Sequence, residues 1–281
     1  MHLGLKNRLP QQLKQHHKLP GLFGGTGRYA IKETTSDLDE LTAVTVTVLM
    51  SGHLHDSGNG FSGWSPFSCY YTDGSSNEHG FYLWYYQGGM YAFLGYGATN
   101  PKFFYISPNS LHEATTGGAK KDCSYMTYFA FTATAASTSN NLKLYAWNNM
   151  AATTSAPTTQ LLSGTDSLTW TNWGTLGTNS SVVIGGQKNG SGSFGSAMTD
   201  DYVVHRVQMF DSALSQANIE KGIDIAGGHI RPVDYNTGSY TQPIHEWTPT
   251  IDSTTISDRG SATGIDLAIQ GSADVAYYKE N

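Results

Sequence analysis

Carboxylate spacing is the first feature of this sequence that could indicate chemistry. A retaining glycosidase needs two carboxyl groups about 5–5.5 Å apart, which alternate residues on one face of a strand would supply. Asp37, Asp39 and Glu40 come closest, but their segment TTSDLDEL lacks β-branched flanks and is typical of a polar loop. The sequence therefore predicts no catalytic residue and no enzyme. A glycoside hydrolase or a polysaccharide lyase is the alternative.

Aromatic side chains could stack on the C–H faces of sugars, and at 12% of the chain they are abundant. Their segments also look like strands, so a role in the core competes with sugar binding. Trp84 and Tyr85 are adjacent and would face opposite sides of a strand, so one side is expected in the core. Trp64, in the loop GFSGWSPF, is the better surface candidate. The predicted carbohydrate-binding residues are Trp64, Trp84, Tyr85, Trp170 and Trp173.

Runs of β-branched and aromatic residues between Gly, Ser and Asn clusters predict strands rather than helices. Along 202–210, odd-numbered residues are expected on one face and even-numbered residues on the other. Ser215 stands where a helix N-cap belongs, ahead of QANIEKGI, which predicts one capped helical turn. The expected strands span 41–52, the hairpin 81–97 with its turn at 87–89, 102–107, 125–135, 142–147, 167–176, 182–184 and 202–210.

The order of features from residue 182 to 223 is specific: a strand closed by Gly185 and Gly186, a glycine-rich loop, an acidic pair, an alternating strand and the capped turn. It resembles the closing segment of laminin G-like, concanavalin A-like lectin/glucanase domains, with Asn218 where the family usually carries Glu of a capping box. Residues 122–149 resemble the family's central hairpin. The resemblance covers about residues 28–225 and implies an all-β, concanavalin A-like jelly-roll β-sandwich of two antiparallel sheets.

The last part of the chain, residues 231–281, resembles a segment that normally opens a laminin G-like domain. Its late position implies a circularly permuted sandwich or the stub of a second copy. It is too short to form a sandwich alone, so it is expected to dock on the main domain or on a neighbouring chain. The positions that match the family are Trp247, Asp258, Gly260, Gly264 and Leu267.

The same resemblance implies a possible Ca²⁺ ion, which requires six to eight oxygen ligands. Asp200 and Asp201 match the family's acidic pair, and Asp258 matches the acidic position of the permuted loop. The alternative is that these aspartates only satisfy backbone N–H groups in turns. No other cofactor is expected.

Charge and composition limit the partners. The formal charge of −6 disfavours general nucleic-acid binding, and no apolar run is long enough to span a membrane. The N-terminus lacks the apolar stretch of a secretory signal, so synthesis in a host cytoplasm is expected. Without that signal, Cys69 and Cys123 are expected to be reduced thiols rather than a disulfide.

Residues 1–27 form a basic segment with too little apolar surface to fold alone. They are predicted to be an extended anchoring arm that lies on a neighbouring subunit, with a disordered tail as the alternative. Residues 28–230 would form the sandwich. The opening Met1-His2-Leu3-Gly4-Leu5 is similar to the arm of many bacteriophage members of the family. This similarity implies a non-enzymatic, virion-associated structural or adhesion protein, as a capsid decoration, head fibre or tail component, with a sandwich able to bind glycans. A stand-alone lectin is a further alternative, and a homo-oligomer is expected. The proposed contacts of the arm with other virion proteins are Leu3, Leu5, Leu9, Lys14 and Lys18.

Overall fold

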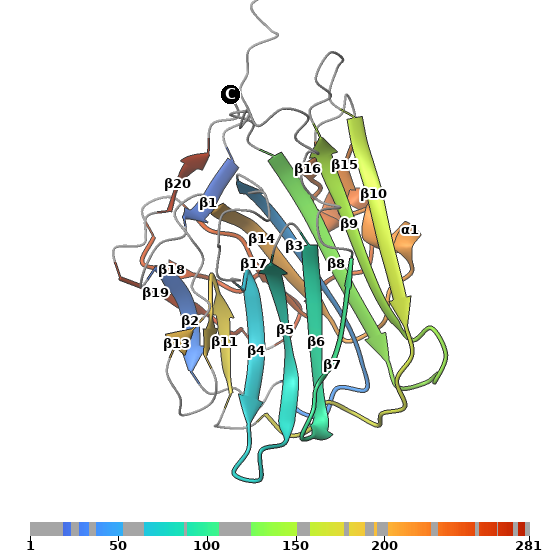
Figure 1. Ribbon diagram of the computed structural model, residues 1–281. Helices are drawn as coiled ribbons and strands as arrows, with labels where there is room; N and C mark the ends of the chain where they lie inside the picture. The colour runs from blue at the N-terminus through green and yellow to red at the C-terminus, as the bar shows by residue number, and fades with distance from the viewer. Residues whose placement is uncertain are drawn as a thin grey trace, which may run out of the picture.

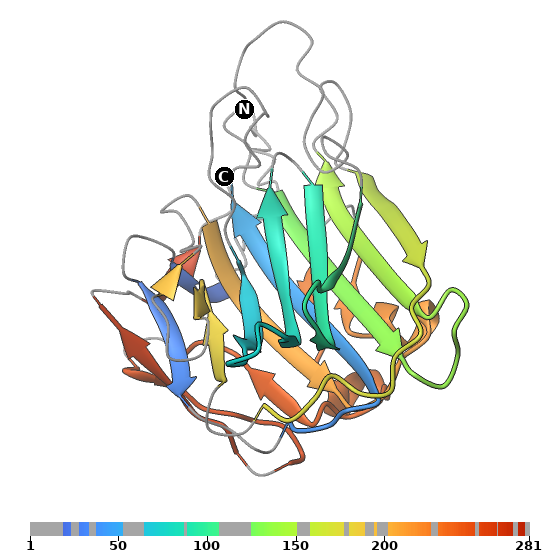
Figure 2. The same ribbon diagram turned by 60° about the horizontal axis from the view of Figure 1, so that its bottom comes forward.

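The structure is a computed structural model in which two antiparallel sheets face each other (Figures 1 and 2). It is almost entirely β, and the expected jelly-roll β-sandwich is confirmed. The structure describes residues 19–23, 28–33, 38–52, 65–86, 89–106, 125–150, 158–176, 180–188, 194–195, 202–225, 230–250, 253–262, 264–271 and 275–278.

The first sheet, sheet A, has β14 at its centre, with β3 on one side and both β1 and β17 on the other. In spatial order it contains β10 (Thr158–Asp166), β9 (Leu142–Met150), β8 (Tyr125–Thr134), β3 (Ala43–Gly52), β14 (Tyr202–Phe210), β1 (Leu19–Phe23) and β20 (Val275–Tyr278), with β17 (His245–Trp247) beside β14.

The second sheet, sheet B, lies in front of sheet A in Figure 1. In spatial order it contains β18 (Thr255–Ile256), β19 (Leu267–Gln270), β2 (Tyr29–Glu33), β11 (Ser181–Ile184), β4 (Phe67–Thr72), β5 (Glu78–Tyr86), β6 (Gly89–Ala98) and β7 (Lys102–Ile106). The small elements are the pairs β12 (Gln187–Lys188) with β13 (Phe194–Gly195) and β15 (Ile223–Asp224) with β16 (Arg231–Pro232), and the helices α1 (Gln216–Glu220) and α2 (Tyr235–Gly238).

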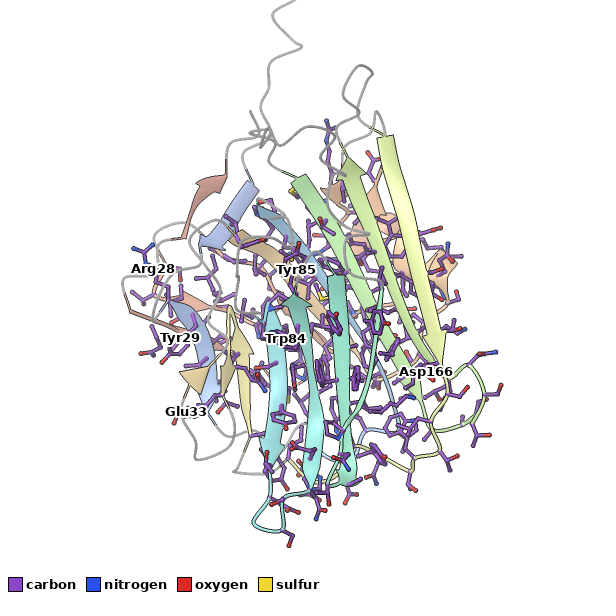
Figure 3. The ribbon with its side chains drawn as sticks, in the orientation of Figure 1. Arg28, Tyr29, Glu33, Trp84, Tyr85 and Asp166 are labelled. Carbon is purple, nitrogen blue, oxygen red and sulfur yellow. The ribbon has the colours of Figure 1, made fainter. Side chains whose placement is uncertain are left out.

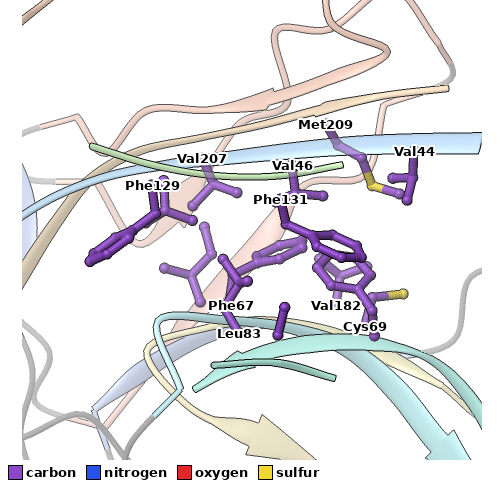
Figure 4. Packing of buried hydrophobic residues seen from close by; sticks show 14 of the residues in the cluster. Val44, Val46, Phe67, Cys69, Leu83, Phe129, Phe131, Val182, Val207 and Met209 are labelled. Carbon is purple, nitrogen blue, oxygen red and sulfur yellow. The ribbon is translucent and has the colours of Figure 1, made fainter. Parts of the chain in front are cut away.

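The main core fills the space between the two sheets (Figure 4). Because successive strand residues point to opposite faces, alternate residues of each strand enter it. Phe81 of sheet B stacks on Phe131 of sheet A, with ring centroids 5.7 Å apart. Phe67 packs against Trp247 at 5.6 Å. These aromatic contacts across the sandwich hold the two layers together.

A second, smaller core lies on the outer face of sheet A. Leu49, Tyr128 and Trp147 point away from the main core and are covered by Ile219 of α1 and Ile223 of β15. The outer face of sheet A is therefore partly roofed by the segment that follows β14. The outer face of sheet B, by contrast, carries large side chains that stay exposed, Phe103 and Tyr105 of β7.

Most predicted elements match the structure. The segments predicted at 41–52, 102–107, 125–135 and 182–184 correspond to β3, β7, β8 and β11. Ser215 is the N-cap of α1, and its hydroxyl accepts a hydrogen bond from the Asn218 N–H at 3.3 Å. Cys69 is a buried free thiol whose pKa is raised to about 12, mainly by desolvation, and Cys123 lies outside the described residues.

Two predictions about strands are wrong. Residues 167–176 form no strand; this segment is irregular and inserts Trp170 and Trp173 into the core, while the strand β10 lies just before it. Along β14 the alternation of faces breaks, because a bulge between Val204 and Arg206 shifts the register by one residue. Val204 and Val207 consequently both face the main core.

The C-terminal segment, residues 231–281, contributes strands to both sheets. β17 pairs with β14 and β20 pairs with β1 in sheet A, while β19 pairs with β2 in sheet B. Residues from the two ends of the described chain thus lie side by side (Figure 1).

Candidate functional site

Strands β4 to β7 carry aromatic side chains on the outer face of sheet B. On β5, Phe81, Leu83 and Tyr85 belong to the main core, so the residues between them, Tyr82 and Trp84, point outwards. The neighbouring strands repeat this alternation. We call the resulting surface the aromatic face; it consists of Tyr70, Tyr82, Trp84, Tyr91, Phe93, Phe103 and Tyr105.

Strand register arranges these rings in two rows across the strands. In the first row, Tyr82 is opposite Phe93, which is opposite Phe103. The second row contains, in the same way, Trp84, Tyr91 and Tyr105. Directly opposed side chains on one face of a sheet are close enough to interact, so the register itself assembles the surface.

The rings of both rows are in contact. Tyr82 and Phe93 stack with centroids 4.3 Å apart and planes only 10° from parallel, and Phe93 stacks on Phe103 at 5.7 Å. Tyr91 lies 5.2 Å from Tyr105 and 5.9 Å from Trp84. A ring held by its neighbours loses little further freedom when a ligand covers it, which favours binding.

Exposure increases towards β7. Phe103 and Tyr105 are 53% and 47% exposed and are the large hydrophobic residues that the described part of the chain leaves open. Tyr82, Trp84, Tyr91 and Phe93 are partly exposed, whereas Tyr70 is buried. Phe103 and Tyr105, with the partly exposed rings beside them, therefore form a candidate interaction surface.

The charges near the aromatic face lie at its margins. Lys102, at the start of β7, pairs with Asp166 of β10 at 2.7 Å, where the edges of the two sheets approach each other. Burial, reinforced by the Glu78 carboxylate, raises the pKa of Tyr82, so this phenol stays neutral. The two rows themselves contain no acidic or basic side chain, which suits an uncharged ligand.

Among the predicted sugar-binding residues, the structure brings Trp84 into the aromatic face but separates Tyr85 from it (Figure 3). Tyr85 is 4% exposed and packs against Tyr202 of sheet A. The neighbouring ring of Trp84 points to the other side of β5. The prediction for Tyr85 is therefore corrected, because its ring is part of the core.

Trp170 and Trp173 are also core residues, which corrects their prediction as sugar platforms. The Trp173 ring is fully buried, stacks on Phe81 at 5.5 Å and donates from Nε1 to the Leu38 carbonyl at 2.6 Å. Trp170 donates from Nε1 to the Thr134 carbonyl at 3.1 Å. Neither ring can reach a sugar. Trp64 lies outside the described residues.

Asp258 is not arranged to bind calcium. Its side chain is 1% exposed, and both oxygens already accept two hydrogen bonds each. The donors are Nδ1 of His245, at 2.5 Å, and the backbone N–H groups of Glu246, Gly260 and Ile265. Since a carboxylate offers about four lone-pair sites, none is left for a cation. The calcium prediction for Asp258 is corrected accordingly.

The other predicted site residues, Asp200, Asp201, Leu3, Leu5, Leu9, Lys14 and Lys18, lie outside the described residues. Within the described ranges, no group of three or more His, Cys, Asp or Glu side chains could hold a metal ion. None of the helices described is both long and apolar enough to cross a membrane.

Sequence reasoning missed most of the aromatic face. Phe103 and Tyr105 lie in KFFYI, which was recognised as a strand, but nothing in the sequence marks which of its faces is exposed. The alternation of Phe103, Phe104 and Tyr105 was the available signal. This alternation indicates that Phe103 and Tyr105 share one face of the strand. Whether that face is exposed depends on the neighbouring strands, which the sequence of this segment does not specify.

Comparison with known proteins identifies no family for this chain. No protein-family model and no curated protein sequence matches the chain. The heptameric SAP-like pentraxin from Limulus polyphemus is similar at 14% identity, over 90% of this chain and 95% of that chain, with a TM-score of 0.48. The Ruminococcus gnavus IT-sialidase CBM40 bound to α2,6-sialyllactose is similar at 13% identity, over 71% and 94%, with a TM-score of 0.43.

The binding domain of Botulinum Neurotoxin DC in complex with SialylT is similar at 7% identity, over 88% of this chain and 68% of that chain, with a TM-score of 0.43. These likenesses concern the fold alone.

Proposed function

We propose that the protein is a non-enzymatic glycan-binding protein, and that the aromatic face is its binding surface. The observation that supports this proposal is the pair of aromatic rows on β5, β6 and β7, with Phe103 and Tyr105 about half exposed. Flat aromatic rings present an apolar surface to the C–H faces of sugar rings, and tyrosine and tryptophan add a polar edge for hydroxyls.

The geometry favours an extended polysaccharide over a single sugar. Neighbouring strands lie ~4.8 Å apart, so each row of three rings extends ~10 Å across the sheet from its first to its last strand. No charged side chain interrupts the rows, which favours a neutral glycan over an acidic one. The contact is shared between several rings. Each sugar residue can therefore bind weakly while the whole polysaccharide binds well.

The aromatic face can be tested by removing its most exposed rings. We expect Phe103→Ala and Tyr105→Ala each to weaken binding to a neutral polysaccharide about tenfold, because exposed aromatic residues dominate such surfaces. The measurement is affinity electrophoresis over a panel of soluble glucans, mannans and xylans. Tyr235→Ala is the matched control, since this partly exposed tyrosine lies on α2 and is not part of the aromatic face. Equal binding by all three variants and the unaltered protein would refute the proposal.

The location of the protein is a separate part of the proposal. The resemblance of the sequence to bacteriophage members of the laminin G-like family supports a virion-associated protein that presents the sandwich to host or environmental glycans. The predicted arm, residues 1–27, is corrected at its end, because residues 19–23 form β1 of sheet A, and the proposed attachment is through residues 1–18. Deleting residues 1–18 retains β1, which begins at Leu19. We expect this variant to keep polysaccharide binding but to be lost from purified particles; normal incorporation would exclude the anchoring role.

A further inference from the structure

A pocket opens on the other side of the molecule, at the outer face of sheet A. Along one edge of β14, β1 pairs with Val203 and Val204, whereas β17 pairs only from Val207 onwards. His205 and Arg206 therefore lie at a gap between the two partner strands, at the position of the bulge. The cavity at this gap has a volume of about 180 Å³, and besides His205 it is lined by Arg206, Pro232, Asp234, Glu246, Thr248 and Arg259.

One buried polar atom of the lining has no hydrogen-bond partner within the described part of the chain. Arg206 is 5% exposed; it donates to the carbonyls of Val233 and Gly222 at 2.8 and 2.6 Å, but its Nε has no hydrogen-bond partner. Oε2 of Glu246 accepts a hydrogen bond from Nε2 of Gln208 at 2.5 Å. Oε1 of Glu246 lies 3.6 Å from the Arg259 guanidinium, too far for a hydrogen bond.

Arg259 supplies further unused donors. Its side chain is half exposed, and its guanidinium is held by two long ion pairs, to Glu246 at 3.6 Å and to Asp234 at 3.5 Å. The pocket thus presents guanidinium donors of Arg259 and a carboxylate oxygen of Glu246 that are joined only by a long ion pair, beside the unpartnered Nε of Arg206. A ligand that bonds to Arg259 and Glu246 at normal hydrogen-bond distance would gain free energy.

The charges of the lining determine the kind of ligand. Two arginines are balanced by two carboxylates, so the pocket attracts neither an anion nor a cation strongly. Hydroxyl groups both donate and accept, which matches a lining of mixed donors and acceptors. The volume is below the ~300–1,000 Å³ of pockets for drug-sized ligands, and Pro232 is the one apolar residue of the lining. We infer that this pocket binds a single neutral sugar residue through its hydroxyl groups.

The arrangement supports binding rather than bond cleavage. Hydrolysis needs the glycosidic bond to lie between two carboxyl groups, but here the Arg259 guanidinium contacts both Asp234 and Glu246. Burial is the main cause of the raised pKa of Tyr240, next to this pocket, and it keeps that phenol protonated and unsuited to act as the base of a lyase. The inference does not depend on the aromatic face, which belongs to the other sheet.

The test is a titration of the full chain with monosaccharides, in which NMR measures the binding. The probes are glucose, galactose, mannose and N-acetylglucosamine, with acetate and glycine as charged probes of similar polarity. We expect saturable binding of at least one monosaccharide, little changed between low and high salt, because no net charge attracts the ligand. Glu246→Gln should weaken this binding about tenfold, because it replaces a charged acceptor while keeping the side chain's size.

Two controls make the result decisive. Glu33→Gln makes the same change at an exposed glutamate of β2 and should leave monosaccharide binding unchanged. Arg259→Gln should weaken it even if Glu246→Gln fails to fold, because Arg259 is half exposed. Three results would each overturn the inference: no saturable binding of any sugar, binding that both pocket variants retain, or saturable binding of acetate or glycine alone. If the protein releases free sugar from an oligosaccharide, the role of the pocket is catalysis, and the inference that it only binds sugar is wrong.

Discussion

Replacing Trp247 with alanine is expected to destabilise the protein by about 3–5 kcal/mol, because a fully buried indole leaves a large cavity in the core. Trp247 packs against Phe67 of the opposite sheet, and its Nε1 donates to the Ile265 carbonyl at 2.7 Å. The change would thus remove both a contact between the sheets and a bond within the C-terminal segment. Urea unfolding followed by circular dichroism measures the effect.

Trp84→Ala is the matched control for this experiment, since it removes the same side chain from a partly exposed position. We expect it to cost only about 1 kcal/mol. It should also reduce polysaccharide binding, which Trp247→Ala should not do wherever that variant remains folded. If both variants unfolded at the same urea concentration, Trp247 would not be the core residue that its burial indicates, and the C-terminal segment would not support the sandwich.

Asp258→Ala is expected to destabilise the protein by about 3–5 kcal/mol, because it leaves buried donors without an acceptor. The carboxylate joins His245 of β17 to the loop that follows β18. Burial alone would raise its pKa, but the hydrogen bonds from His245 and from the N–H groups of Ile265, Gly260 and Glu246 outweigh burial and lower it below 3.8.

The lowered pKa of Asp258 determines how its contribution to the stability of the protein changes with pH. The unfolded carboxyl titrates near 3.8 and the folded one lower, so the unfolded state binds the proton first as the pH falls. The stabilisation by Asp258 is complete above 3.8 and is lost as the pH falls through the folded value. Asp258→Ala should accordingly show a smaller loss of stability on acidification than the unaltered protein.

Asp266→Ala is a suitable control, because this exposed aspartate accepts one bond, from the Asp258 N–H at 2.8 Å. It should cost less than about 1 kcal/mol. A variant of Asp258 that unfolds along the same pH curve as the unaltered protein would contradict the proposed role of this carboxylate.

The two proposed sugar sites differ in the way in which the fold builds them. The aromatic face arises within sheet B, from strands that follow one another in the chain. The pocket arises where β14 meets residues that follow it at increasing distance in the sequence, from Pro232 to Arg259. The C-terminal segment therefore has a double role here: it completes both sheets and supplies most of the pocket's charged groups.

Local patterns determined much of the secondary structure. The β-branched run at 182–184, the aromatic strands and Ser215 as an N-cap could all be recognised, because propensity, alternation and capping act over a few residues. The same patterns misled at 167–176, where Trp170 and Trp173 enter the core from an irregular segment. An aromatic residue is driven to burial by its area, whatever the conformation of the backbone around it.

The sequence by itself determined that Trp84 and Tyr85 point to opposite sides of one strand, since that follows from the geometry of any strand. Only the tertiary structure decided that Tyr85 is the buried one, because the choice depends on which face of sheet B packs on sheet A. The bulge after Val204 and the meeting of Arg206, Glu246 and Arg259 were likewise decided by strand pairing across long stretches of sequence. Such pairings lower the free energy of the whole sheet and leave no local mark in the residues that they join.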